Sequence, residues 1–354
     1  MNDGWFIRVD LKMMNRLLIH FFGLITVVSV GAVAQAQESC APEPDVSSVL
    51  KLPSTPNNAI KKKAAIFHKK SVANQTTQSK QVLAKLYPAK VFKLKGDVVL
   101  VSRGGQWVNR PLTVGTELFL DDVVETGRQS FVTIMLGSGV TSVLPSNAKV
   151  ALKQASDSVA RYELLKGSIE NRVEKKPNAK RSVFEIVVPN GVLGVRGTQF
   201  AVDYDLGRGE SGVSVTEGVV VVRPLQSCSV SLVVADGHSA RIGRTFNSTS
   251  DIHGLLAAPV WTNIQAQRNN DFSFDVSTVD GAVKYVAQVA RDANFIDVVA
   301  EQESPSRGGR VVVPGSDLPD GFYYVRLAAL DQYGLRGLTQ THLFLKNMKT
   351  ISGE

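Results

Sequence analysis

The chain has 354 residues, a formal net charge of +8 and a hydrophobic fraction of 44%. This much apolar sequence excludes a wholly disordered chain, and the length exceeds what one small core usually organises, so we expect two folded domains plus additional segments. The 29 glycines and 14 prolines favour many short strands joined by turns.

The N-terminal segment has the pattern of an export signal. Arg16 precedes an apolar run, and Ala34-Gln35-Ala36 follows with the small residues that a signal peptidase accepts. We predict a signal peptide over residues 1–36, whose true start is Met1 or else Met13 or Met14. No later run is apolar enough to span a membrane, so we expect no stable membrane span after cleavage and a periplasmic location.

Residues 37–88 are predicted to form a lysine-rich linker. They show no sustained helical or strand period, and no acidic residue occurs between Val46 and Lys95. The positive charge is interpreted first as a solvated tether and alternatively as an attraction to anionic polymers or lipid head groups. Nucleic acid is not an expected partner, because export separates the protein from it and the lysines are not interleaved with aromatic residues in the way a base-stacking platform requires.

The only cysteines are Cys40 and Cys228, and both lie after the predicted cleavage site. Export permits a disulfide between them, but a single distant pair is neither a disulfide framework nor a metal-ligand spacing. The sequence leaves the bridged and the free forms open.

Residues 89–250 are predicted to form an all-β domain. Short β-branched runs alternate with glycine, helical periodicity is absent, and roughly ten strands are expected, among them residues 162–165, 168–173 and 213–222. The segment Gly207-Arg208-Gly209-Glu210-Ser211-Gly212 has the glycine spacing of a dinucleotide loop. It leads into a strand rather than a helix, so we interpret it as a hairpin turn.

The most specific motif of the chain begins at Pro189-Asn190-Gly191 and continues as Val195-Arg196-Gly197-Thr198-Gln199-Phe200-Ala201-Val202. It is followed by Val215-Thr216-Glu217-Gly218-Val219-Val220. In these residues the chain resembles the FecR family, over about residues 91–245, although Ser138 stands where relatives usually carry an acidic turn residue. The motif residues, which we expect to be structural, are Pro189, Gly191, Val195, Arg196, Gly197, Thr198, Phe200, Glu217 and Gly218.

Arg196 admits two structural interpretations. On an unbroken strand it shares a face with Thr198 and Phe200 and points inward. A buried guanidinium needs acceptors, which Glu217 or turn carbonyls could provide. Alternatively, a bulge at Gly197 turns Arg196 outward. We favour a structural role for Arg196 over ligand binding.

Residues 256–347 are predicted to form a β-sandwich, after a joint at residues 251–259. The strand spacing is typical of sandwiches, and the expected aromatic core is Trp261, Tyr285, Tyr324 and Phe344. With the segment from Leu318 to Arg326, this part resembles fibronectin type III-like domains, a likeness that specifies no ligand. Tyr333 and Arg336 lie in a loop that we interpret as an ordinary hairpin tip rather than a contact surface.

No combination of residues typical of catalysis or metal binding is found. The histidines after residue 36 are widely spaced, and neither a paired-cysteine site nor a Gly-x-Ser-x-Gly elbow occurs. We therefore predict a non-enzymatic protein with no catalytic, cofactor-binding or metal-ligating residues and no cofactor.

The FecR resemblance implies two classes of function. Some members of the family are membrane regulators that pass a ferric-siderophore signal to a sigma factor, with a cytoplasmic domain and a membrane span before the FecR domain. Here only a signal-like segment occupies that place, so we favour a periplasmic binding or scaffold module. Its expected partner is an envelope protein, peptidoglycan or another anionic envelope polymer. The alternatives are a sensor or regulatory component of a FecR-type system and, last, an enzyme acting on envelope polysaccharide.

Overall fold

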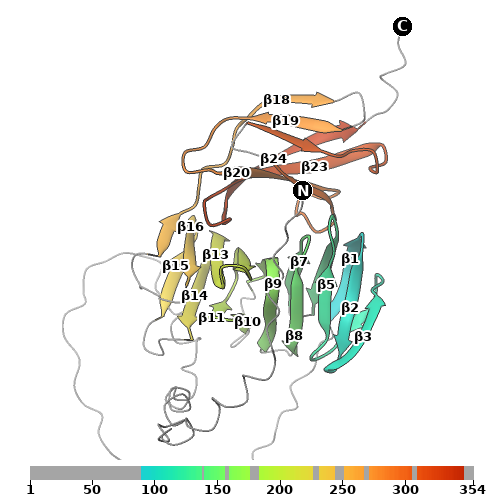
Figure 1. The fold of residues 1–354 in the computed structure, drawn as a ribbon, viewed down its shortest axis with the longest axis vertical. Coiled ribbons are helices and arrows are strands. Elements are labelled where there is room, and N and C mark those ends of the chain that lie inside the picture. Colours follow the sequence, from blue (N-terminus) through green and yellow to red (C-terminus); the bar gives the residue numbers. More distant parts are fainter. Residues whose placement is uncertain are drawn as a thin grey trace, which may run out of the picture. The chain divides into compact units, whose positions relative to one another are not determined.

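The computed structural model describes residues 89–137, 139–155, 159–175, 183–225, 231–243, 251–266, 271–304 and 309–346 (Figure 1). All regular elements in these ranges are strands, which confirms the predicted all-β class. The predicted signal peptide, the lysine-rich linker, Cys40 and Cys228 lie outside the described residues.

Seventeen strands are connected by hydrogen bonds into one sheet system, more than the roughly ten predicted. They are β1 (Ala89–Lys95), β2 (Val98–Arg103), β3 (Gln106–Pro111), β4 (Glu117–Leu118), β5 (Val123–Thr126), β6 (Phe131–Leu136), β7 (Val140–Leu144), β8 (Lys149–Ala155), β9 (Val159–Val173), β10 (Val183–Val188), β11 (Gly191–Val195), β12 (Gln199–Asp205), β13 (Glu210–Glu217), β14 (Val219–Pro224), β15 (Leu232–Ala235), β16 (His238–Ile242) and β17 (Ile252–Gly254).

The strands form two ladders that share β9. The first ladder runs β4-β1-β6-β7-β9-β12-β13-β16-β17. The second ladder runs β3-β2-β5-β8-β9-β10-β11-β14-β15, and its β9–β10 pair is parallel. The N-terminal half of β9 belongs to the second ladder and its C-terminal half to the first.

The change of ladder along β9 occurs at Gly167. Its φ is +77°, and a Cβ atom there would lie only 2.7 Å from the carbonyl oxygen of Asn147. Glycine is the residue that tolerates both the positive φ and this close backbone approach. The two strands predicted at 162–165 and 168–173 are therefore one long bent strand.

A single hydrophobic core fills the space between the two ladders. At its centre the ring of Phe184 contacts Tyr162 at 5.6 Å and Phe200 at 6.3 Å between centroids. Tyr162 and Phe184 come from strand segments of the second ladder and Phe200 from the first. These contacts therefore join the two ladders through aromatic packing.

The C-terminal strands form a separate sandwich. A three-stranded sheet, β18-β19-β22, packs on a four-stranded sheet, β21-β20-β23-β24, around a second core. These strands are β18 (Trp261–Ala266), β19 (Phe272–Val276), β20 (Lys284–Ala290), β21 (Val298–Glu303), β22 (Arg310–Val313), β23 (Gly321–Leu330) and β24 (Arg336–Lys346).

The aromatic core of the sandwich differs from the prediction at one position. Tyr285 is buried, and Trp261 and Phe344 are partly buried against the core as expected. Tyr323, rather than Tyr324, fills the core and stacks on Phe344 at 5.6 Å. Because neighbouring side chains on a strand point to opposite faces, Tyr324 lies on the outer face of the four-stranded sheet.

Candidate functional site

The Val-Arg-Gly-Thr motif connects the two ladders. β11 ends at Val195 in the second ladder, and β12 begins at Gln199 in the first. Between them Gly197 has φ +65°, Arg196 is exposed and Thr198 is buried. The unbroken strand considered above is therefore not formed, and the chain turns Arg196 outward at Gly197.

At Gly218 the chain crosses a second time between the ladders, now from the first ladder to the second. β13 ends in the first ladder and β14 begins in the second, so the single strand predicted at 213–222 is two strands. Gly218 has φ +85°, and a Cβ there would lie 2.7 Å from the carbonyl oxygen of Gly197 and 2.8 Å from Cγ2 of Thr198. The two halves of the motif thus pack directly on each other, and we name this pair of turns the glycine corner.

The other motif residues surround the glycine corner. Val195 and Phe200 are buried in the core, and Pro189 is exposed at the turn between β10 and β11. Gly191 lies close to the backbone of Arg223, because a Cβ atom added at Gly191 would be 3.2 Å from the carbonyl oxygen of Arg223. Glu217 is exposed and forms no ion pair with a described residue, so the proposed pairing of Glu217 with Arg196 is not present.

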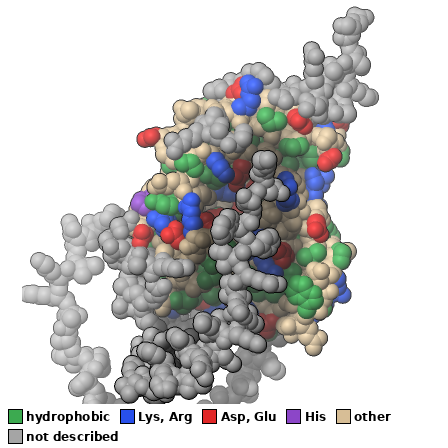
Figure 2. Space-filling model, viewed as in Figure 1, with side chains coloured by type: hydrophobic (Ala, Val, Ile, Leu, Met, Phe, Trp, Pro, Cys, Tyr) green, Lys and Arg blue, Asp and Glu red, His purple; other side chains and the backbone are tan. Residues whose placement is uncertain are grey.

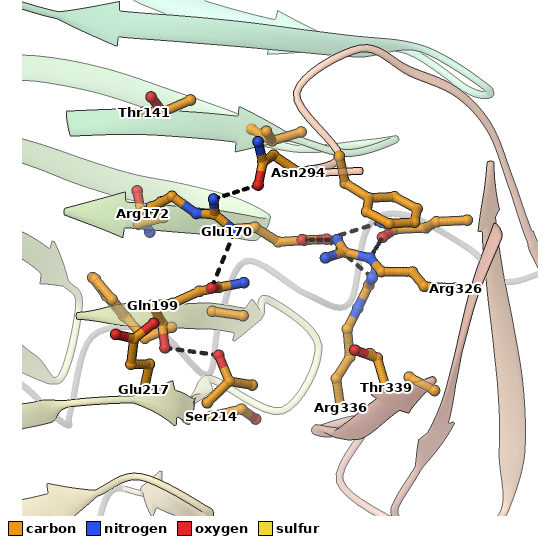
Figure 3. A pocket seen from close by; sticks show the side chains of 18 of the residues that line it. Thr141, Glu170, Arg172, Gln199, Ser214, Glu217, Asn294, Arg326, Arg336 and Thr339 are labelled. Atoms are coloured by element: carbon orange, nitrogen blue, oxygen red, sulfur yellow. Dashed lines mark hydrogen bonds and ion pairs between the residues drawn. The ribbon is translucent and has the colours of Figure 1, made fainter. Parts of the chain in front are cut away.

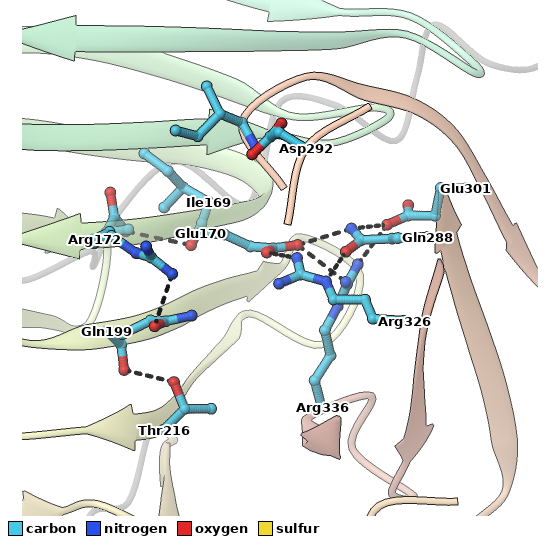
Figure 4. A network of polar contacts seen from close by, with 12 residues as sticks. Ile169, Glu170, Arg172, Gln199, Thr216, Gln288, Asp292, Glu301, Arg326 and Arg336 are labelled. Atoms are coloured by element: carbon cyan, nitrogen blue, oxygen red, sulfur yellow. Dashed lines mark hydrogen bonds and ion pairs between the residues drawn. The ribbon is translucent and has the colours of Figure 1, made fainter. Parts of the chain in front are cut away.

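A group of buried charges, which the sequence analysis missed, lies where the outer face of the first ladder meets the sandwich (Figure 4). Glu170 of β9 accepts hydrogen bonds from Gln288 Nε2 at 2.8 Å, from Arg336 Nη1 at 3.0 Å and from Arg326 Nη2. Glu301 accepts from Arg336 Nη2 at 2.7 Å. We call these five residues the charge cluster.

The charge cluster is balanced and largely removed from water. Its four charged side chains are 13–16% exposed and Gln288 is 1% exposed. Gln288 also accepts a hydrogen bond from Arg326 Nε at 2.6 Å and donates one to Glu301 at 2.5 Å. Two carboxylates and two guanidiniums therefore compensate each other, which is the condition under which buried charges are tolerated.

Electrostatic interactions within the charge cluster keep Glu170 and Arg336 ionised. Burial raises the pKa of Glu170, but the guanidiniums of Arg326 and Arg336 outweigh burial and hold that pKa at about 2. For Arg336, burial alone would lower the pKa, but the carboxylates of Glu301 and Glu170 outweigh burial and raise it. The charges of Glu170 and Arg336 are thus maintained by their opposite partners.

Asp203 of β12 lies close enough to the charge cluster to sense its charges and behaves differently. Burial raises its pKa to about 6, against the opposing influence of Arg336. Its Oδ2 is shielded from solvent and has no hydrogen-bond partner among the described residues. Asp203 is therefore a group near the charge cluster whose charge changes close to neutral pH.

A cleft of about 280 Å³ lies beside the charge cluster (Figure 3). Arg172 of β9 lines it and donates from Nη1 to Asn294 Oδ1 at 2.7 Å and from Nη2 to Gln199 Oε1 at 3.2 Å. Thr216 Oγ1 donates to the carbonyl oxygen of Gln199 at 2.9 Å. Glu217 and Phe200 also line the cleft, so two of the motif residues belong to it.

Two loops of the sandwich contact the first ladder on either side of these polar groups. Phe295, which has φ +56°, packs in a buried apolar cluster with Phe131 and Val143. On the other side, a Cβ at Gly212 would collide with Leu335, and the guanidinium of Arg241 lies 3.8 Å from the ring centroid of Tyr333. The interpretation of residues 333–336 as an ordinary hairpin tip was wrong, because this loop is a contact surface.

Within the described ranges, no group of three or more His, Cys, Asp or Glu residues is arranged to hold a metal ion. In that part of the chain no helix long and apolar enough to cross a membrane is present.

The comparison with protein families supports the resemblance of the motif region. Residues 122–221 match the family model described as FecR protein. These residues contain β9 to β13 and both turns of the glycine corner. The match shows that this region, which is all-β in its described part, is similar to the FecR family. No protein of curated function matches the chain.

Three of the solved structures with partial similarity come from two bacteria. Two crystal structures of a candidate anti-sigma factor from Parabacteroides distasonis match at 15% identity, over 37% of this chain and 57% of that chain, with a TM-score of 0.30. The extracellular domain of a candidate one-component system from B. thetaiotaomicron matches at 14% identity, over 69% of this chain and 39% of that chain, with a TM-score of 0.17. This chain therefore spans little more than half of the anti-sigma factor.

Proposed function

We propose that the chain is a non-enzymatic component of a FecR-type regulatory system that works in the bacterial envelope by binding a partner. The observation that carries the proposal is the match of residues 122–221 to the FecR family. The geometry of the motif supports it. The glycine corner is built from backbone contacts and buried side chains, so it shapes a scaffold and leaves the sheet faces to interact.

The C-terminal sandwich belongs to the same proposed binding unit. Its sheets of three and four strands around an aromatic core support the fibronectin type III-like assignment. The charge cluster connects this sandwich to the first ladder. We propose a periplasmic location, for which the export pattern of residues 1–36 is the support.

A deletion strain tests the regulatory role. Removing the chain should change a small, coherent set of transcripts in response to ferric siderophore, and the full-length chain should restore them. A variant without residues 1–36 should fail to restore them. Unchanged transcripts in the deletion strain, or full rescue by the variant that lacks the export pattern, would contradict the proposal.

A second proposed activity is docking on an anionic envelope polymer such as peptidoglycan. The acid-free, lysine-rich stretch from Val46 to Lys95 favours it. Binding to purified sacculi should be strong at low salt and weaken when salt screens the charges. Binding that never exceeds that of a variant with the lysines of residues 51–85 changed to glutamine would exclude this activity.

A further inference from the structure

Two lining side chains of the cleft carry charges that no described residue neutralises. Arg172 donates only to the neutral amides of Asn294 and Gln199, and Glu217 forms no ion pair within the described ranges. The other charges of the lining, Glu170, Arg326 and Arg336, are balanced together with Glu301 in the charge cluster. The cleft therefore presents one positive and one negative group that are available to a ligand (Figure 3).

The spacing of these two charges is set by the sheet. Gln199 of β12 pairs with Arg172 on β9 at one side and with Glu217 on β13 at the other. Neighbouring strands lie about 4.8 Å apart, so the two charged residues are anchored about 10 Å apart on one sheet face. An extended peptide covers roughly 3.3–3.6 Å per residue, so two or three residues match this span better than a single amino acid does.

The size and walls of the cleft agree with a short peptide. Its volume of about 280 Å³ lies near the lower end of small-molecule sites, which begin at roughly 300 Å³. Val286 and Ala328 provide apolar wall, and the Ser214 hydroxyl is buried at the lining without a hydrogen-bond partner among the described residues. Ser214 and the amides of Gln199 and Asn294 can serve peptide N–H and C=O groups.

We propose that this cleft binds the two termini of a short zwitterionic peptide with small side chains. Arg172 holds the carboxylate and Glu217 holds the ammonium group. The inference rests on the proposed binding function and specifies its ligand class. Because lining residues come from both the first ladder and the sandwich, a bound peptide also joins the two.

Calorimetric titration of the full chain with alanylalanine and alanylalanylalanine tests the proposal. The zwitterionic peptides should bind, and the N-acetylated or C-amidated forms should bind about tenfold more weakly, since each has lost one charge-assisted contact. Binding should also raise the melting temperature of the chain. The proposal is overturned if no peptide binds at concentrations up to roughly 10 mM, or if the blocked peptides bind as well as the free ones.

Matched variants connect each terminus to its residue. Arg172→Gln should weaken binding of the free peptide about tenfold and leave binding of the amidated peptide unchanged. Glu217→Gln should likewise weaken binding of the free peptide about tenfold and leave binding of the acetylated peptide unchanged. Arg172→Lys should restore part of the affinity, and the exposed Arg110→Gln should change nothing. Equal losses in Arg110→Gln, or undiminished binding by Arg172→Gln and Glu217→Gln, would refute the assignment.

The peptide experiment and the transcription experiment fail separately. Peptide binding without a transcript response would contradict the regulatory role and support the proposed ligand class. A transcript response in a chain that binds no peptide would remove the ligand class alone.

Discussion

The glycine corner and the charge cluster hold the molecule together by different physical means. The glycine corner joins two connections that are about twenty residues apart in sequence, and it depends on backbone conformation at Gly197 and Gly218. The charge cluster joins side chains from β9 to β24 and depends on charge balance. The comparison shows that a local motif can specify the shape of a scaffold, whereas the docking of the sandwich depends on residues without any shared motif.

The comparison predicts different sensitivities. At Gly218 the glycine corner has no space for an added Cβ atom, because that atom would meet the carbonyl oxygen of Gly197 and Cγ2 of Thr198. The charge cluster can tolerate changes of shape but not the loss of a single charge, which leaves its opposite partner buried and unpaired.

Removal of the Glu170 carboxylate should have the largest effect. In Glu170→Ala the guanidiniums of Arg326 and Arg336 lose a shared partner, so the free energy of unfolding should fall by about 3–5 kcal/mol. Urea denaturation measures it. The control Glu163→Ala removes a more exposed carboxylate, 3.4 Å from Lys153, and should cost about 1 kcal/mol or less. Similar losses in both variants would show that the charge cluster is not energetically special.

Gly218→Ala should break the glycine corner. The added Cβ meets the carbonyl oxygen of Gly197, and the positive φ alone costs about 1–2 kcal/mol, so a total loss of about 2–3 kcal/mol is expected. Gly237→Ala is the matched control, since Gly237 also has positive φ, at +73°, but has open space around it. If both variants lose the same stability in thermal unfolding, the close approach is not what requires glycine.

Asp203→Asn should change how stability depends on pH. The pKa of Asp203 is raised from 3.8 to about 6, so the folded protein binds the extra proton, and stability falls as pH rises from about 4 through about 6. Asparagine removes this loss. At pH 7 the free energy of unfolding of the variant should therefore exceed that of the parent by about 1 kcal/mol or more.

At pH 4 the two forms should be nearly equal, because Asp203 is then protonated when folded. Glu170 has the opposite sign, since its stabilisation is present above its ordinary pKa of 4.5 and is lost as pH falls toward 2. Melting temperatures between pH 4 and pH 8 measure the difference. Parallel curves for the variant and the parent would contradict the role of Asp203.

Arg196→Ala should have the smallest effect. The side chain is exposed at the glycine corner, so the change in unfolding free energy should be about 0.5 kcal/mol or less. Chemical denaturation of the variant and the parent measures it. A loss of several kcal/mol would restore the alternative in which Arg196 is a buried, paired cation.

Local patterns in the sequence predicted much of the fold. β1 and β2 are separated at Gly96-Asp97 as the turn residues indicate, and residues 206–209 form the hairpin turn expected of the glycine-rich loop. Two of the errors concern strand boundaries, and both occur at a glycine. Gly167 bends a strand that was predicted to be interrupted, and Gly218 interrupts a strand that was predicted to be continuous.

The buried charges had a weak signal in the sequence. Arg326 stands in the middle of an otherwise apolar strand, from Gly321 to Leu330, and Glu170 lies in the alternating segment Ser168-Ile169-Glu170. A lone charge within such a strand indicates a partner across an interface, but it does not identify the partner. The sequence separations, 156 residues for Glu170 and Arg326, explain why no local pattern could pair them.

Strand periodicity and glycine preferences act over a few residues, so local patterns suffice to predict the all-β class, many turn positions and the resemblance to the FecR family. The folded structure was needed to show which sheet face meets the sandwich, that Glu170 and Arg336 are partners, and that Arg172 and Glu217 line one cleft. These arrangements depend on strands that are distant in the chain and become neighbours when the two hydrophobic cores are buried. Because the hydrophobic effect is not directional, the sequence of one strand does not indicate which distant strand will pack against it.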